Sequence, residues 1–168
     1  MDDFVDLGAL DVNGTGLTLA VAFRADSFPG PSSDPRLISK ATGTQANQHV
    51  FMLGTVGVGS EVQLRARVRH GGVTTTLIAS SGSLVTGEWY HAAMTYDGAT
   101  FRLYLDGTEV GSSLFFGAVD IDPTIPVAVG GQPPGAGDRY FDGLIDDVRI
   151  LSRAMSATEV AEIAAGVN

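Results

Sequence analysis

The sequence predicts an all-β protein, in which two antiparallel sheets form a sandwich and one short helix follows at the C-terminus. Two observations predict this fold. Large apolar residues recur at every second position through most of the 168-residue chain, which is the pattern of half-buried strands. Turn sequences rich in glycine and proline separate these runs at short intervals, with no helical pattern between them. Such spacing favours an antiparallel sandwich over a sheet of alternating strands and helices.

The clearest local element is a hairpin around Asp97-Gly98, because glycine adopts a positive φ without steric cost between two alternating strands. A second turn at Asp106-Gly107 extends the hairpin into a meander that starts at Trp89 and ends near Leu114. The other predicted strands are 17–24, 36–39, 50–53, 61–69, 73–79, 127–129 and 144–151.

The helical pattern is confined to the C-terminus. Ser156 and Glu159 have the spacing of a capping box, in which each side chain bonds to the backbone N–H of the other. Val160 and Ile163 then fall on one helical face, and Gly166 provides a stop signal. We therefore expect one short helix packed on the sandwich.

Length and composition exclude several classes of protein. A chain of 168 residues without cysteine is long enough for one domain, spanning 1–168, with a core that needs no disulfide. The net charge of −9 argues against binding to nucleic acid, since such proteins concentrate lysine and arginine. The acidic start Met1-Asp2-Asp3 does not resemble a signal peptide, and no apolar run reaches the length of a membrane span. We expect no membrane span, and a location inside the cell unless a longer parent protein is exported.

The run Gly87-Glu88-Trp89 to Gly98 and the run Phe141-Asp142-Gly143 to Ser156 resemble segments of laminin-G-like jelly-roll domains of the concanavalin A-like lectin/glucanase superfamily. The run 87–98 followed by 101–107 resembles the central hairpin of that family, and 141–156 resembles its last strand and the start of its short helix. Residues 3–7 and the strand through Phe23 are similar to its first strands. The resemblance implies a jelly-roll sandwich that is commonly extracellular, binds glycans or proteins, and often holds calcium. Some relatives on this sandwich are hydrolases or lyases.

The residues do not support catalysis. Glucanases of this superfamily carry Glu-x-Asp-x-x-Glu on one strand, which places a pair of carboxylates on one face, and that motif is absent. His49, His70 and His91 do not lie in a recognisable lyase motif, and we interpret His91 as a structural residue. The chain is therefore expected not to be an enzyme.

Candidate ligand-binding residues are Arg65, Arg67, Arg69 and Trp89. The three arginines alternate along one strand, so they project from the same sheet face. One interpretation is that they form ion pairs across strands or lie on a solvated face. The other is that they line a groove for uronate or sulfated glycans, since arginine binds carboxylate and sulfate bidentately. Trp89, the only tryptophan, either packs in the fold or stacks on a sugar ring.

Calcium is the predicted cofactor, and the candidate ligands are Asp26, Asn47, Gln132, Asp138 and Asp146. Asn47 and the segment 132–138 match the positions of calcium ligands in related pentraxins, although Pro133-Pro134 departs from that pattern. Strict alternation would place Asp146 on an apolar face, where a carboxylate must be hydrogen-bonded or metal-bound.

Together these observations predict a non-catalytic module that holds a structural calcium ion and binds either a carbohydrate or a protein. The carbohydrates considered include acidic glycans. A structural or assembly domain of a larger surface or adhesin-like protein is the alternative, and a glycoside hydrolase or polysaccharide lyase without a recognisable motif is the third hypothesis. The predicted location is extracellular or at the cell surface, as part of a larger protein.

Overall fold

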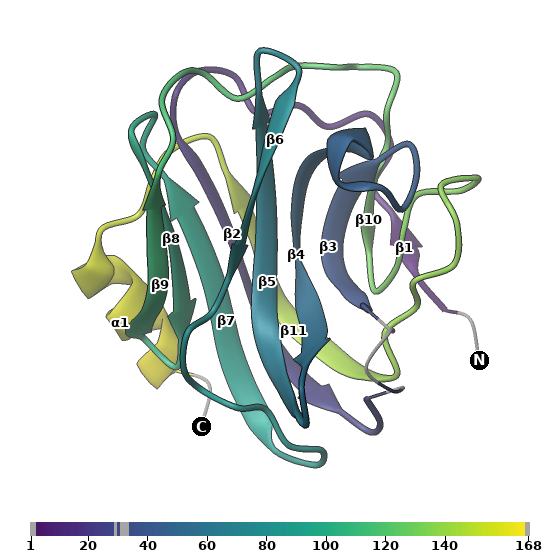
Figure 1. Cartoon of the computed structure of the whole chain (residues 1–168), viewed down its shortest axis with the longest axis vertical. Helices are drawn as coiled ribbons and strands as arrows, with labels where there is room; N and C mark the ends of the chain where they lie inside the picture. The colour runs from purple at the N-terminus through teal and green to yellow at the C-terminus, as the bar shows by residue number, and fades with distance from the viewer. Residues whose placement is uncertain (1–2, 29, 31–33, 167–168) are drawn as a thin grey trace.

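The computed structural model describes residues 3–28, 30 and 34–166. Within these residues two antiparallel sheets are stacked on one another, and the helix α1 (Ala157–Ala165) lies beside β8 and β9 (Figure 1). The six-stranded sheet has the order β1-β10-β3-β4-β5-β6, and the five-stranded sheet has the order β11-β2-β7-β8-β9. The prediction of a two-sheet antiparallel jelly-roll sandwich with a short C-terminal helix is confirmed.

The strands are short to medium in length. Those of the six-stranded sheet span, in the order given, Val5–Asp6, Val127–Val129, Arg36–Ala41, His49–Val58, Glu61–His70 and Val73–Ile78. Those of the five-stranded sheet span Gly143–Leu151, Leu17–Ala25, Trp89–Tyr96, Thr100–Leu105 and Thr108–Leu114. The 3-10 turn η1 (Ala46–Gln48) precedes β4. Among the elements in the described residues, it is the one that the sequence did not predict.

The core lies between the two sheets and contains the inward half of each alternating strand. In β2 the residues Leu19, Val21 and Phe23 are fully buried. The Phe23 ring meets the edge of Phe141, with ring centroids 5.8 Å apart, and so ties β2 to the segment before β11. This core holds both outer faces of the sandwich in fixed positions.

The predicted meander β7-β8-β9 is confirmed. Asp97 Oδ1 accepts hydrogen bonds from the backbone N–H of Ala99 at 2.9 Å and of Thr100 at 2.7 Å, which closes the first turn. Gly98 has φ of 87° and lies against Thr15, so a side chain there would be both strained and crowded.

The capping box of α1 is also confirmed. Glu159 N–H donates to Ser156 Oγ at 3.3 Å, and Ser156 N–H donates to Glu159 Oε2 at 2.8 Å. Val160, fully buried, packs on Ala93 and Tyr104 at the outer face of the five-stranded sheet. The helix therefore covers one part of that face.

Strand β11 departs from strict alternation, and the predicted placement of Asp146 on an apolar face is wrong. The pairing of β11 with β2 shifts between Asp146 and Arg149, and Asp147 has φ of 49°. This β-bulge adds one residue, so that Ile145 and Ile150 both pack against the core although five positions separate them. Asp146 is exposed instead of lying on an apolar face, and its Oδ1 accepts from Asp147 N–H at 2.7 Å.

No helix in the described part of the chain is both long and apolar enough to cross a membrane.

Candidate functional site

The three arginines of β5 share the outer face of the six-stranded sheet, as their alternation predicts. Leu64, Ala66 and Val68, which lie between and before them, are fully buried in the core. Arg65 and Arg67 are nevertheless largely buried too, with exposed fractions of 7% and 8%. Arg65 and Arg67 are therefore not part of a solvated stripe.

Arg69, at the end of β5, is neutralised. Its Nε donates to Asp120 Oδ2 at 2.9 Å. Asp120 also accepts from the backbone N–H of Gly71 at 2.6 Å and of Gly72 at 2.9 Å. These bonds and the Arg69 charge outweigh the effect of burial, which would raise the pKa of Asp120, so its pKa lies below the ordinary value. Asp120 thus both neutralises Arg69 and closes the turn between β5 and β6.

The other two arginines belong to a larger group that the sequence did not predict. Arg65 Nη2 donates to Asp34 Oδ2 at 2.5 Å. The same carboxylate forms ion pairs with Arg36, whose Nη1 is 3.1 Å from Oδ2, and with Arg139. Arg67 lies next to Arg65 on β5 and has no carboxylate partner among the described residues. We name Arg36, Arg65, Arg67, Arg139 and Asp34 the arginine cluster.

Backbone geometry brings the members of the cluster together. Gly54 of β4 lies under Pro35, and a β-carbon at position 54 would collide with the Pro35 carbonyl oxygen. That oxygen accepts from Thr55 N–H at 3.1 Å, which fixes the segment carrying Asp34 on the sheet. Arg36 N–H donates to the carbonyl of Arg139 at 3.0 Å, so the loop before β11 joins the same place.

The arginine cluster is unbalanced in charge and in hydrogen bonding. Four guanidinium groups face one carboxylate within the described residues. Arg36 is fully buried, and its Nε and Nη2 have no hydrogen-bond partner; the same is true of Arg65 Nε. Buried polar groups are rarely left unpaired, and buried unpaired charges are costly.

The pKa values express the same imbalance. Burial, only partly offset by Asp34 and reinforced by Arg65 and Arg67, lowers the pKa of Arg36 to about 9. Burial and the charge of Arg65 lower the pKa of Arg67 to about 10. Burial would raise the pKa of Asp34, but the hydrogen bond from Arg65 and the charges of its three arginine partners hold it below the ordinary value. At neutral pH Arg36, Arg67 and Asp34 are therefore ionised, and the surplus of guanidinium groups gives the cluster the electrostatic character of an anion-binding site.

His49, also fully buried, supports Arg67 from the start of β4. Its Nδ1 lies 2.8 Å from the Gln45 carbonyl oxygen, which can only accept, so Nδ1 carries the proton. Arg67 Nη1 lies over the ring, 3.2 Å from Nδ1 and 3.5 Å from Nε2, and Nε2 is the ring atom that can accept. Arg67 Nε donates to Thr76 Oγ1 at 3.2 Å. Burial, followed by the charges of Arg36 and Arg67, lowers the pKa of His49 to about 3. His49 is thus a neutral support of a cationic site.

The five predicted calcium ligands lie in two regions. The segments of Asn47 and of Gln132 and Asp138 touch, since Gln132 bonds to Gly43 and Gly137 lies against Thr44, whereas Asp26 follows β2 and Asp146 lies in β11. Asp26 pairs with Arg24 at 3.1 Å, and Asp138 and Asn47 are exposed in separate segments. Gln132 is buried, and its amide is used within the protein, since Nε2 donates to the Gly43 carbonyl at 2.9 Å and Oε1 accepts from Ser39 Oγ at 2.6 Å. In the described ranges no group of three acidic or histidine side chains could hold a metal ion. Calcium also accepts backbone and amide oxygens, so the ion stays a prediction.

Trp89 lies on the other side of the molecule from the arginine cluster. It starts β7 in the five-stranded sheet, where its Cα partner is Arg24, and 42% of it is exposed. His91, two residues later, is 1% exposed, and neither of its ring nitrogens has a hydrogen-bond partner.

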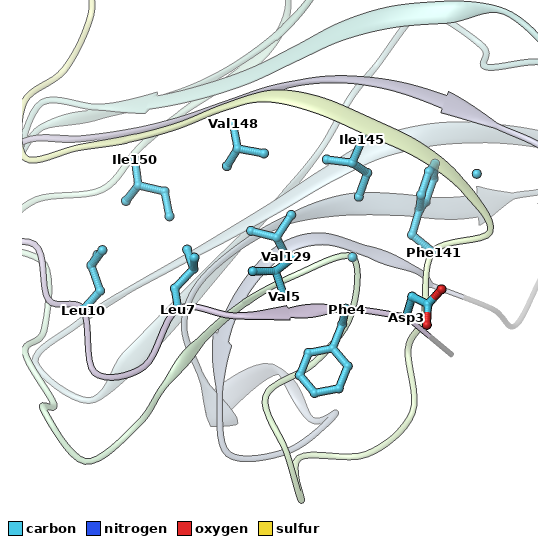
Figure 2. A pocket seen from close by; sticks show the side chains of 12 residues that line it. Asp3, Phe4, Val5, Leu7, Leu10, Val129, Phe141, Ile145, Val148 and Ile150 are labelled. Carbon is cyan, nitrogen blue, oxygen red and sulfur yellow. The ribbon is translucent and has the colours of Figure 1, made fainter. Parts of the chain in front are cut away.

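An apolar cleft of about 600 Å³ opens between the edges of the two sheets. Figure 2 shows Ile145, Val148 and Ile150 of β11 on one side of it, facing Val5 and Leu7 on the other. Asp3 is the charged side chain among the lining residues. The cleft suits apolar contact and offers few groups that could recognise a polar ligand.

Comparisons with known proteins agree with this architecture. The chain is 23% identical over 137 residues to Adhesion G-protein coupled receptor V1 of Danio rerio, which covers 80% of this chain and 2% of the receptor. The carbohydrate-binding module CBM40 of the Ruminococcus gnavus IT-sialidase, solved with α2,3 sialyllactose, superposes with a TM-score of 0.69 at 19% identity, covering 89% of this chain and 83% of that one. Domain 4 of AbnA, an extracellular arabinanase of Geobacillus stearothermophilus solved with arabinotriose, superposes with a TM-score of 0.65 at 19% identity, covering 89% and 66%.

The structural neighbours share the fold and are mainly binding modules, some of them parts of enzymes. A laminin-G family profile, described as the concanavalin A-like lectin/glucanases superfamily, matches residues 1–161. The chain therefore belongs to the laminin-G-like family of the concanavalin A-like lectin/glucanase superfamily.

Proposed function

We propose that this chain is a non-catalytic module that binds acidic glycans outside the cell through the arginine cluster. The observation that carries the proposal is the charge imbalance of the cluster. In the described residues four guanidinium groups face one carboxylate, and three of these arginines, Arg36, Arg65 and Arg67, are buried. A carboxylate or sulfate group of a sugar supplies both the missing negative charge and acceptors for unpaired N–H groups.

The surroundings of the cluster suit a sugar ring. On β6, next to β5, Thr76 and Ile78 are exposed, and Ile78 is the Cα partner of Arg65. The Thr76 hydroxyl could bond to sugar hydroxyls and the Ile78 side chain could pack on the apolar face of a sugar ring, next to the charged donors of the arginines. The ligand would thus lie along β5 and β6, with its acidic group at the arginines.

The relatives support a glycan as the partner. The CBM40 module was solved with sialyllactose, an acidic trisaccharide, and the AbnA domain with arabinotriose. One of these proteins is described as extracellular and another relative as an adhesion receptor, which supports a location outside the cell. At these identities the likeness itself is one of fold, so the choice of an acidic glycan rests on the arginine cluster.

The cluster lacks the groups that glycoside hydrolysis requires. Most glycosidases need two carboxyl groups, one of which donates a proton. Asp34 is the carboxylate of this cluster in the described ranges, and three arginines hold it ionised. An acid held in that state is a poor proton donor, which supports binding without catalysis.

A glycan array with matched variants tests the proposal. We expect binding to uronate, sialylated or sulfated glycans but not to their neutral counterparts. Arg139→Ala should weaken binding about ten- to hundredfold, the value of a hydrogen bond to a charged group. Arg102→Ala is the control, because its side chain is 31% exposed against 35% for Arg139, and it pairs with Asp97 on the opposite sheet.

Equal binding of acidic and neutral glycans would overturn the proposal, as would an equal loss of binding affinity with Arg139→Ala and Arg102→Ala.

The array is read in calcium and in EDTA, which also tests the predicted ion. A signal that requires calcium would support that prediction, and a signal equal in both buffers would contradict it for this site.

A second candidate function, assembly with another copy of the chain, is favoured by the apolar cleft. Val5 is 57% exposed and Leu7 is 41% exposed at its edge. If two copies cover these surfaces, sedimentation velocity will show self-association that Leu7→Glu abolishes. Leu114→Glu, at an exposed position away from the cleft, is the control. A wild-type protein that stays monomeric at high concentration would remove this function and leave the glycan proposal intact.

A further inference from the structure

The outer face of the five-stranded sheet carries a second group of side chains beyond the part that α1 covers. Leu144, Arg24 and Trp89 lie side by side on β11, β2 and β7, as successive Cα partners. We name these three residues the Trp89 row. Leu144 is 47% exposed and Trp89 is 42% exposed, while the Arg24 side chain is 35% exposed. An aromatic ring, an aliphatic chain and a guanidinium group are therefore all open to solvent in one line.

The neighbouring row holds buried polar groups without partners. His91 follows Trp89 on the same face of β7, next to the small residue Ala22. His91 is 1% exposed, and neither of its ring nitrogens has a hydrogen-bond partner. Arg24 Nε, in the Trp89 row itself, is likewise buried without a partner. Arg149 is the Cα partner of Ala20, one row beyond His91, and its Nη1 is also buried without a partner. Unpaired polar atoms from three strands thus lie along this face, starting at the row of the exposed tryptophan.

We propose that the Trp89 row, with His91 and Arg149 behind it, is a second carbohydrate site, which takes a neutral hexose stacked on the Trp89 ring. The electron-rich face of an indole attracts the C–H groups on one face of a sugar ring. A sugar hydroxyl can both donate and accept, as can the two nitrogens of a neutral imidazole, of which one is a donor and the other an acceptor. The row therefore offers the two things that hexose recognition requires, an aromatic platform and unpaired hydrogen-bonding groups.

The charges around this row favour a neutral sugar over an acidic one. Arg24 is already paired with Asp26. Three charged side chains lie close enough to His91 to affect its pKa: Arg149 lowers it, and Asp106 and Asp147 raise it. Burial, and then Arg149, keep the pKa of His91 below its ordinary value, so the ring is neutral at pH 7. No surplus of positive charge exists here within the described residues, in contrast to the arginine cluster.

Trp89 is the only tryptophan in the chain, so its fluorescence reports on this site alone. We expect titration with lactose or cellotriose to change the emission of the wild-type protein in a saturable manner. Calorimetry on the variants then tests the platform. Trp89→Ala should weaken binding about tenfold or more, and Trp89→Phe less, because it keeps a smaller ring. Phe116→Ala is the control, an exposed aromatic outside the row.

The two sites are tested separately. Arg139→Ala should leave the lactose or cellotriose titration unchanged, so failure of the acidic-glycan proposal does not imply failure here. The inference is overturned if neither sugar changes the emission, or if Trp89→Ala binds them as well as the wild type does. Emission that changes with protein concentration and not with sugar would also overturn it, since the row would then be a contact between copies.

Discussion

Asparagine in place of Asp34 is expected to lower the free energy of unfolding by about 3–5 kcal/mol, because it leaves buried guanidinium groups without a counter-charge. Asp34 is the carboxylate that Arg36, Arg65 and Arg139 share. The substitution keeps the shape of the side chain, so the loss reports charge. Urea unfolding at low ionic strength measures it.

Sulfate should restore much of the stability of Asp34→Asn, since the vacated cluster is an anion site with four cations. Asp120→Asn is the matched control, because the Asp120 side chain is 21% exposed against 16% for Asp34 but pairs with Arg69 alone. We expect no such rescue by sulfate for the control. A variant of Asp34 as stable as the wild type in low salt would show that the cluster is not unbalanced.

The second large effect is acid sensitivity through His49. The folded protein holds the pKa of His49 at about 3, whereas the unfolded chain takes up that proton near its ordinary value of 6.5. Between these values the unfolded state binds more protons, so stability is fully present above pH 6.5 and is lost as the pH falls toward 3. At 1.36 kcal/mol for each pH unit, the loss from this group reaches about 3–5 kcal/mol.

Denaturant unfolding across this pH range, with His49→Gln beside the wild type, measures the effect. The variant lacks the titrating ring, so its stability should fall less steeply with acid, although it starts from a lower value at pH 7. His70→Gln is the control, since the His70 ring bonds to the Ala118 carbonyl in an exposed turn. Parallel pH profiles for wild type and His49→Gln would contradict the assignment of His49 as a buried neutral residue.

The sequence was sufficient for the sheets because the signals are local. Alternation along β5 predicts which side chains share a face, and Asp97-Gly98 predicts a turn from the conformational freedom of one residue. The same local rules fail at β11, where the bulge at Asp147 changes the phase of the alternation without a proline or glycine to mark it. Asp146 was misplaced for that reason.

The arginine cluster could be predicted only in part. Arg65 and Arg67 are visible as a pattern within one strand, but Arg36 and Arg139 come from other segments and meet them only when the sheet forms. Asp34 gives no sequence signal, because its position depends on the close approach of Pro35 to Gly54. Such a juxtaposition is a property of tertiary packing, which a single sequence read for periodicity does not contain.

If acidic glycans bind the arginine cluster, occupancy of that site also affects how much folded protein exists, because the free cluster is unbalanced in charge. A ligand that binds only the folded state shifts the folding equilibrium toward it, by an amount that grows with the ratio of ligand concentration to Kd. The free module, with its unpaired guanidinium groups, is the less stable of the two states. Where acidic glycans are abundant, the module would resist unfolding and proteolysis, and where they are scarce it would be removed more rapidly. The partner would thus regulate the lifetime of the protein that recognises it.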